Sequence, residues 1–338
     1  MTDTTSEAFT ASVTLTPATA EHFDLAFTAV TQPCPWPKAY GGDLVAQAAA
    51  AAMRSVDDGK TLHSMHSYFM RPAEIGKEVR YEVELLRDGR GYATRQVRGY
   101  QNGKPLYVCL ANFAAGEPGP GYQRGVTDLP GPEELPSSAE YLADRNGGTM
   151  TPASKDYWST GRSFDMRHVP GPVYLTVEGA PTPHQAVWVR PFDALRSVDG
   201  LTDAQRDAAA LAYVCDYTIL EPVLRVLGLH WAQEGLVTAS LDHAMWFHRA
   251  PRPGVADGWL LYAQQAEAAE AGRGLASGRF FTPDGAHLAT VVQEGMLRTS
   301  PTGASGAGAS GAGASGAGAS GAGASGAGAS GAGQAGRP

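Results

Sequence analysis

The residues best suited to chemistry are a few polar side chains in the second half of the chain. Asp216 lies in an otherwise apolar stretch. An unpaired carboxylate is costly to bury, so Asp216 is the strongest candidate for a catalytic acid or base. Ser240, Asp242 and the neighbours Gln293 and Glu294 complete the set. Taken alone, Ser240 is also consistent with a hydroxyl at a sheet edge, and Gln293 with a solvated strand residue.

Other combinations of these residues would give different chemistry. Ser240, Asp242 and His243 have the residue types of a nucleophilic triad. Neighbours on a strand point to opposite faces, so Asp242 and His243 cannot readily form a hydrogen-bonded pair. Asp242 does share a face with Ser240 and is therefore the main rival of Asp216. His66 is a further candidate, but it corresponds to His243 in an internal repeat, which favours a shared structural hydrogen bond.

Several common catalytic signatures are absent from the sequence. It contains no GxSxG, GxxxxGK[ST] or HExxH motif, which argues against the usual serine hydrolase, P-loop and zincin chemistries. The three cysteines, Cys34, Cys109 and Cys215, show no CxxC spacing. We therefore expect neither a metal site nor a disulfide framework, and no cofactor is indicated.

The elements that must position these residues occur twice. The block Gly89-Arg90-Gly91-Tyr92-Ala93 returns as Gly272-Arg273-Gly274-Leu275-Ala276, at an offset of 272 − 89 = 183 residues. A His-aromatic segment precedes each copy. An Asn-Gly or Asp-Gly turn, at Gly103 and Gly285, follows each copy and predicts a β-hairpin. The sequence therefore predicts that one fold occurs twice along the chain.

Each copy has the same predicted order of elements. In the first, a strand over residues 23–30 precedes a long apolar helix that begins near Gly41, with Asp43 as its cap, and ends at 57–59. Alternating strands follow over 63–113. Each sheet is expected to wrap its apolar face around its helix.

The second copy repeats this plan with an interruption in its helix. A strand over 187–190 precedes a helix that opens with the capping box of residues 202–205. Pro222 then breaks the helical pattern. We expect the helix to stop near Asp216 and to restart after a second capping box at 218–221, which would place Asp216 beside a helix N-terminus.

The polar set is specific to the second copy. At the offset of the hairpin glycines, 285 − 103 = 182, Gln293 corresponds to Ala111. At the offset of the paired histidines, 243 − 66 = 177, Ser240 corresponds to His63, and residue 242 to residue 65. Because the first copy has apolar or different side chains at these positions, the chemistry is predicted to lie in the second.

Composition limits the location and partners of the protein. The chain has 338 residues, 43% of them hydrophobic, and a formal net charge of −8, which argues against nucleic acid as a partner. Its start has neither a basic nor an apolar leader region, and no apolar run is long enough to cross a membrane. We expect a cytoplasmic protein. The Gly/Ala/Ser repeats over 300–338 cannot form a core and are predicted to be disordered.

Longer segments resemble a known family. The runs at 63–72, 86–89 and 101–105 resemble the N-terminal half of the acyl-CoA thioesterase II family, and those at 241–249 and 292–295 resemble its C-terminal half. The resemblance covers roughly residues 20–115 and 160–299. It implies an α+β double hotdog fold, in which two tandem units each have a long helix wrapped by an antiparallel sheet.

The resemblance also suggests how the chain is divided. We expect an N-terminal hotdog unit at 1–115, a proline-rich linker at 116–159, a C-terminal hotdog unit with the catalytic residues at 160–299, and the repeat tail at 300–338. By analogy with the family, a homodimer or homotetramer is expected.

The implied activity is hydrolysis of a fatty acyl-CoA to free fatty acid and CoA. The family's functional Asp, Thr or Ser, and Gln fall by motif on Asp216, Ser240 and Gln293, with Ser where many members have Thr. Asp216 would accept a proton from water while Ser240 and Gln293 hold that water, and a backbone amide near a helix start would bind the oxyanion. No metal or further cofactor is implied.

Two alternatives belong to other functional classes. The chain could be a non-catalytic acyl-CoA binding or regulatory hotdog protein. It could also be an enoyl-CoA hydratase-like hotdog enzyme, although the DxNxxH spacing of such enzymes does not occur. Release of CoA by the purified protein separates these possibilities.

Overall fold

The computed structural model describes residues 5–56, 59–126, 129–143, 145, 150–249 and 258–299. The predicted disorder of the tail falls outside these residues. Among them, no helix is long and apolar enough to cross a membrane.

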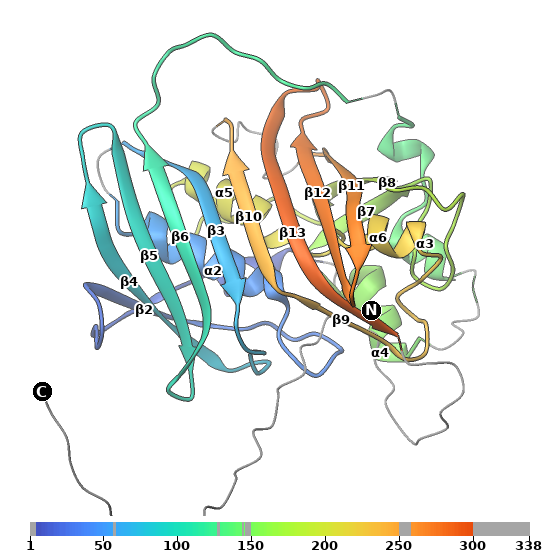
Figure 1. The fold of residues 1–338 in the computed structure, drawn as a ribbon, viewed down its shortest axis with the longest axis horizontal. Coiled ribbons are helices and arrows are strands. Elements are labelled where there is room, and N and C mark those ends of the chain that lie inside the picture. Colours follow the sequence, from blue (N-terminus) through green and yellow to red (C-terminus); the bar gives the residue numbers. More distant parts are fainter. Residues whose placement is uncertain are drawn as a thin grey trace, which may run out of the picture.

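Thirteen strands of the described residues form one antiparallel sheet (Figure 1). Their bounds are β1 Thr16–Ala18, β2 Leu25–Val30, β3 Thr61–Phe69, β4 Glu78–Asp88, β5 Tyr92–Gln101, β6 Lys104–Ala114, β7 Phe164–Val169, β8 His184–Pro191, β9 Leu236–Ser240, β10 Asp242–Phe247, β11 Leu260–Glu270, β12 Arg273–Phe281 and β13 His287–Thr299. The order is β1-β2-β4-β5-β6-β3-β10-β13-β12-β11-β8-β7, with β9 paired to β13.

The strand order shows the duplication directly. From the centre outward, β3-β6-β5-β4-β2 on one side matches β10-β13-β12-β11-β8 on the other. The halves join where β3 pairs with β10, and Met65 there lies opposite Met245. Both methionines are fully buried. This double hotdog arrangement is the one the sequence indicated.

Helices cover the inner face of the sheet, where α2 and α5 pack against each other (Figure 1). The helices are α1 Glu7–Val13, α2 Gly41–Met53, α3 Ser138–Ala143, α4 Pro152–Asp156, α5 Asp203–Val214 and α6 Glu221–Val226, with short helical turns η1 Pro132–Glu134 and η2 Tyr157–Gly161. The predicted linker at 116–159 contains the short helices α3 and α4. The edge strand β7 was not predicted.

The start of α2 differs from the prediction. The helix begins at Gly41 with Tyr40 in the N-cap position. Asp43 is not the cap: it is fully buried in the first turn and accepts hydrogen bonds from Ser12 Oγ at 2.7 Å and the Gln32 amide at 2.8 Å. The reason is tertiary, because the donors lie in other segments of the chain. The helix ends at Met53, before the predicted stop at 57–59. Residues 57 and 58 lie outside the described residues, and Gly59 has a φ of 75°.

The second helical region follows its prediction in part. The capping box is present: the Gln205 amide donates to Thr202 Oγ1 at 3.3 Å, and the Thr202 amide to Gln205 Oε1 at 2.9 Å. The helix stops at Val214 and restarts at Glu221, as expected. The second capping box is wrong, because Thr218 accepts a hydrogen bond from Gln264 and no side chain caps α6.

Candidate active site

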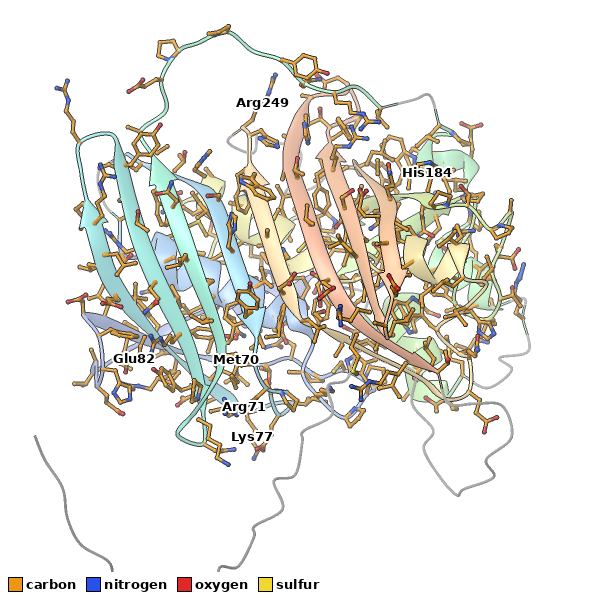
Figure 2. All side chains as sticks on the ribbon, in the orientation of Figure 1. Met70, Arg71, Lys77, Glu82, His184 and Arg249 are labelled. Carbon is orange, nitrogen blue, oxygen red and sulfur yellow. The ribbon has the colours of Figure 1, made fainter. Side chains whose placement is uncertain are left out.

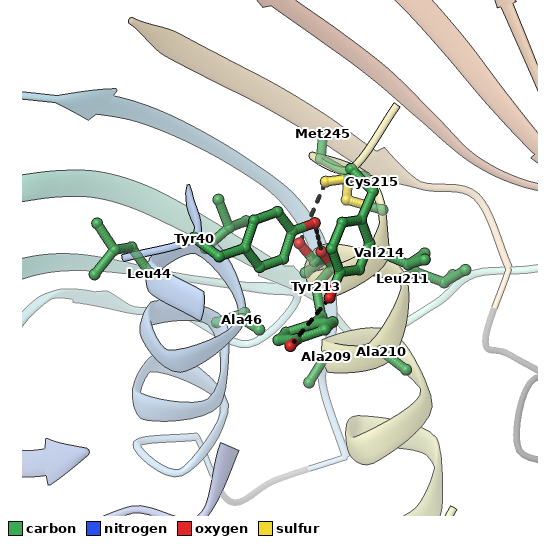
Figure 3. Close-up of a cluster of buried hydrophobic side chains, with 14 of the residues drawn as sticks. Tyr40, Leu44, Ala46, Ala209, Ala210, Leu211, Tyr213, Val214, Cys215 and Met245 are labelled. Atoms are coloured by element: carbon green, nitrogen blue, oxygen red, sulfur yellow. Dashed lines mark hydrogen bonds between the residues drawn. The ribbon is translucent and has the colours of Figure 1, made fainter. Parts of the chain in front are cut away.

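Asp216 lies in the turn that follows α5, where the chain leaves the helix. Aromatic packing fixes this turn against the start of α2. Tyr40 stacks on Tyr217 with ring centroids 4.2 Å apart, and its hydroxyl donates to the Tyr213 carbonyl at 2.6 Å. Figure 3 shows Tyr40 reaching across from α2 to the end of α5. The Asp216 carboxylate is thereby held between the two helices and the sheet.

The structure brings the three predicted residues together. Ser240 Oγ, at the end of β9, donates to Asp216 Oδ1 at 2.7 Å. Gln293 Nε2, on β13, donates to the same oxygen at 2.5 Å and to Ser240 Oγ at 3.0 Å. The three side chains therefore form a closed hydrogen-bonded triangle from elements far apart in the sequence.

Burial sets the acidity of this carboxyl group. It raises the pKa of Asp216 from 3.8 to about 6, opposed by hydrogen bonds from Gln293, Ser240 and the Gly42 amide. The donors stabilise the ionised form without cancelling the cost of desolvation. The group is therefore ionised at neutral pH yet basic enough to accept a proton.

The N-terminus of α2 approaches the other oxygen of Asp216. A Cβ atom added at Gly41 would lie 2.5 Å from Asp216 Oδ2, so only glycine fits there. A Cβ at Gly42 would lie 2.2 Å from the Tyr213 carbonyl oxygen. The positive end of α2 thus faces the carboxylate. The helix N-terminus predicted beside Asp216 is present, but it belongs to α2 and not to the helix after residue 218.

One hydrogen-bonding atom of the Gln293 side chain is unpaired within the described residues. The side chain is fully buried, and its Oε1 has no partner among the described residues. Leaving a buried acceptor unpaired is costly, so such atoms are usually satisfied by water or a ligand. An O–H group placed here would lie beside the triangle.

A cleft of about 860 Å³ opens at Ser240 and Gly41. Its apolar wall includes Leu44 and Phe69. Four basic residues and one acid also line it, namely Lys38, Arg71, Lys104, Arg298 and Glu74. The cleft lies between the halves, since it combines the α2 start and the end of β3 with β9 and β13. Figure 2 places Met70 and Arg71 at this end of the sheet.

The rival residues lie outside the triangle. Asp242 Oδ1 accepts a hydrogen bond from the Glu294 amide at 3.1 Å. His243 is buried, its Nε2 lies 3.3 Å from Cys215 Sγ, and burial lowers its pKa to about 3. His66 is exposed and packs edge-on against Trp246. None of these contacts involves the Asp216 carboxylate.

The predicted equivalence of His66 and His243 is wrong. His66 pairs with Ala244 in the ladder, and His243 with Ser67, so the two rings lie on opposite faces of the sheet. Within the β3–β10 ladder, two residues share a face when their numbers are both odd or both even, as Met65 and Met245 are. An odd offset such as 177 therefore matches residues on opposite faces of these two strands. The equivalences of Ser240 with His63 and of residue 242 with residue 65 fail for the same reason.

Two features of the site were not predicted from the sequence: the close approach at Gly41 and the basic lining of the cleft. The role of Gly41 was read only as a helix start, although two glycines ahead of an alanine-rich helix could have signalled a close approach. The basic residues of the cleft come from four separate segments and show no local pattern. The described residues also contain no group of three or more His, Cys, Asp or Glu side chains arranged to hold a metal ion.

Two family models match this sequence. One, described as the acyl-CoA thioesterase N-terminal domain, matches residues 32–114. The other, described as the acyl-CoA thioesterase C-terminal domain, matches residues 132–297.

Individual relatives agree with these matches. Acyl-coenzyme A thioesterase 8 of Homo sapiens is 34% identical over 273 residues, which is 79% of this chain and 82% of that protein. Acyl-CoA thioesterase 2 of Haemophilus influenzae is 30% identical over 82% of this chain and 93% of its own length. The solved structure of acyl-CoA thioesterase II TesB2 from Mycobacterium marinum is 30% identical, with a TM-score of 0.66 over 88% of this chain and 100% of that one.

Proposed function

The chain belongs to the acyl-CoA thioesterase family, and from this premise we propose that it hydrolyses fatty acyl-CoA with a water activated by Asp216, Ser240 and Gln293. The products are a free fatty acid and CoA, which places the enzyme in lipid metabolism. The observation that carries the catalytic assignment is the closed triangle of these side chains at the wall of the cleft.

The proposed reaction begins with ionised Asp216. A water lies between this carboxylate and Gln293 Oε1, the acceptor without a partner in the described residues. As the water oxygen bonds to the thioester carbonyl carbon, Asp216 takes its proton. The carbon–sulfur bond then breaks, and the proton passes from Asp216 to the CoA sulfur. The water oxygen thus ends in the fatty acid and the transferred proton on the CoA thiol, and no covalent acyl-protein forms.

Ser240 and Gln293 act by orienting Asp216 and the attacking water. Ser240 donates to Asp216 and accepts from Gln293, so each side chain fixes the orientation of the other two. We propose that a backbone amide at the start of α2, at Gly41 or Gly42, donates to the developing oxyanion. Helix N-termini favour negative charge, and a preorganised donor contributes most where charge develops.

The cleft has the chemistry of an acyl-CoA site. Four of its five charged lining residues are basic, and such side chains bind phosphate groups like those of CoA. Burial lowers the pKa of Lys38 to about 8, which leaves it charged at neutral pH. Leu44, Phe69 and Leu106 supply apolar surface for the acyl chain.

Hydrolysis is tested by following free CoA with a thiol reagent in the presence of EDTA, across saturated acyl chains of C4 to C18. Release from medium and long chains supports the proposal. If no chain length gives CoA above background, the chain is a binding protein instead. Hydrolysis in ¹⁸O-water should label the acid product, whereas an acyl adduct on Ser240 in quenched samples would replace the water mechanism with a covalent one.

We also propose that the protein is a cytoplasmic homodimer or homotetramer. On the outer face of the sheet, Tyr68 is 62% exposed and Leu110 is 49% exposed, and His66 and Trp246 lie beside them. Apolar surface on a central sheet face suits a partner sheet. Light scattering on a size-exclusion column should give a mass above one chain, and Leu110→Glu should reduce it. A wild-type monomer would contradict the proposal.

The proposed division of the chain follows the same premise. The hotdog units are assigned to 1–115 and 160–299, the linker to 116–159 and the tail to 300–338. The central strands β3 and β10, one from each unit, support this assignment. Limited proteolysis should cut first within 116–159 or 300–338, and early cuts inside both sheets would contradict it.

A further inference from the structure

A second cleft lies at the opposite end of the sheet from the first. It encloses about 520 Å³ between the end of α2 at Met53, the start of α5 at Ala204 and Gln205, the start of β3 and the end of β10 at Phe247. Figure 2 shows Arg249, which lines it, at the end of the sheet away from Met70 and Arg71. This volume lies in the usual range of ligand pockets, roughly 300–1,000 Å³.

The second cleft is the duplication counterpart of the first. The first is built at the start of α2, the end of β3 and the neighbouring strands of the second half. The second is built at the start of α5, the end of β10 and the neighbouring strands of the first half. Exchange of the two halves therefore converts one cleft into the other.

The strand ladders identify the residues that replace the triangle. Ser240 pairs with Gly295, two residues beyond Gln293. Leu62 pairs with Phe113, two residues beyond Ala111. Strands β6 and β13 superimpose at an offset of 295 − 113 = 182 residues, which agrees with the hairpin glycines, and their partners Leu62 and Ser240 are 240 − 62 = 178 residues apart. Leu62 therefore takes the place of Ser240, and Ala111 the place of Gln293.

The carboxylate is replaced as well. Asp216 stands two residues beyond Val214, the last residue of α5, and Ser55 stands two residues beyond Met53, the last residue of α2. Ser55 Oγ donates to the Ala52 carbonyl at 2.6 Å and accepts from Arg95. No base faces the second cleft from these three positions, so its space is kept while its hydrolytic chemistry is lost.

The lining of the second cleft suits an anionic amphiphile. Apolar side chains, namely Met53, Val56, Leu62, Ala208 and Phe247, form its wall. Its charged and titratable lining residues are Arg54, Lys60, His63, His248 and Arg249. None of the described lining residues is acidic. Burial and the nearby His63 lower the pKa of His248.

We propose that the second cleft binds a long-chain fatty acid as its carboxylate and does not turn it over. The chain would lie against the apolar wall and the carboxylate among His63, His248 and Arg249 at the rim. A single chain with a small head group fits the smaller volume better than acyl-CoA, whose nucleotide needs the larger cleft. The inference rests on the proposed function only in that the fatty acid is the product of the reaction.

Photoaffinity labelling tests this directly on the full chain. A diazirine-bearing hexadecanoic acid is added below its micelle concentration, and labelled peptides are identified by mass spectrometry. Adducts on residues 53–63 or 247–249, removed by excess unlabelled hexadecanoic acid, support a second site. Adducts confined to residues 39–44, 69–73 and 239–241 would mean that the acid binds only as product in the first cleft, and this would overturn the inference.

Charge-reversed variants give a second measurement. His63 and Arg249 are exposed, so His63→Glu with Arg249→Glu should fold. It should lower labelling of the second cleft roughly 10- to 100-fold, the usual cost of losing charged hydrogen bonds. Lys155→Glu, on α4 away from both clefts, is the matched control. Unchanged labelling in the double variant would overturn the inference.

The assay for CoA release separates the two proposals. Labelling of the second cleft in a protein that releases no CoA would remove the proposed function and leave the second site standing. CoA release without labelling at 53–63 or 247–249 would do the reverse. The double variant should keep the wild-type kcat/KM, since both residues lie at the far end of the sheet from Asp216.

Discussion

At the scale of single residues, the proposed catalysis depends on a carboxylate whose ionisation is subject to two opposing effects. Desolvation favours the neutral form of Asp216, while Ser240, Gln293 and the Gly42 amide favour the ionised form. Because desolvation is larger, the pKa is raised to about 6 and not lowered. A base with a pKa near the working pH combines availability with proton affinity.

This shift predicts the pH dependence of the enzyme. Asp216 must be ionised to accept a proton, so kcat/KM should fall tenfold per pH unit below about 6 and level off above it. Stability runs the opposite way: folding raises this pKa from 3.8, so the contribution of Asp216 is greatest below pH 3.8 and is lost as pH rises through 6. A kcat/KM profile measured from pH 4.5 to 9 checks the first statement. An inflection near 4 would show that the active base is an ordinary exposed carboxyl.

Gln293 should matter more than Ser240. Gln293→Ala removes the donor to Asp216 and the water-binding oxygen together, and losing a preorganised donor lowers turnover roughly 100- to 1000-fold. Ser240→Ala should cost less, because Gln293 still holds Asp216. Steady-state kcat is compared between variants whose melting curves show them folded. Equal activity of Gln293→Ala and wild type would remove Gln293 from the mechanism.

The sequence predicted the members of the candidate site but not their surroundings. Asp216, Ser240 and Gln293 stand in recognisable segments, so they could be named before their side chains were seen to touch. Lys38, on the other hand, follows a proline-rich turn and faces the cleft only because of the tertiary fold. The predicted correspondence of His66 with His243 is wrong because the two residues lie on opposite faces of the sheet.

At the scale of elements, α2 packs against α5, and both helices are rich in buried alanine. α2 is buried along its length from Gly42 to Met53 and is rich in alanine. Its first residue, Gly41, leaves room for Asp216. The capping box of α5 could be predicted from the sequence because its two residues are only three positions apart. The start of α2 was not, because the buried Asp43 has partners as far away as Ser12.

Gly41→Ala should therefore damage catalysis more than folding. The added methyl group would lie 2.5 Å from Asp216 Oδ2, so the carboxylate must move. We expect kcat to fall at least tenfold while the melting temperature changes little, since alanine is a good helix former. Gly91→Ala, where an added Cβ meets nothing within 4 Å, is the control. Wild-type kcat in Gly41→Ala would show that the close approach has no catalytic role.

At the scale of the whole molecule, duplication gives two clefts at opposite ends of one sheet. One has the Asp216 triangle, and the other has apolar and basic residues in its place. The doubled plan was visible in the repeated sequence block. The continuous pairing of β3 with β10 was not, because pairing between two repeats leaves no mark within either repeat.

Removal of the tail should leave this architecture unchanged. Residues 300–338 contain no large apolar side chain that could add to a core. A chain ending at Thr299 should have the same melting temperature and specific activity as the full protein. A fall of several degrees would show that the tail docks on the folded part.

The most direct test of the central claim is the turnover number of Asp216→Asn, measured on a long-chain acyl-CoA at pH 8 beside Asp242→Asn. Asparagine keeps the size of the side chain and removes the base, so kcat should fall roughly 10²- to 10⁴-fold. Asp242→Asn should retain kcat, because Asp242 is bonded to the Glu294 amide outside the triangle. If Asp216→Asn keeps wild-type turnover while Asp242→Asn loses it, the base has been assigned to the wrong residue.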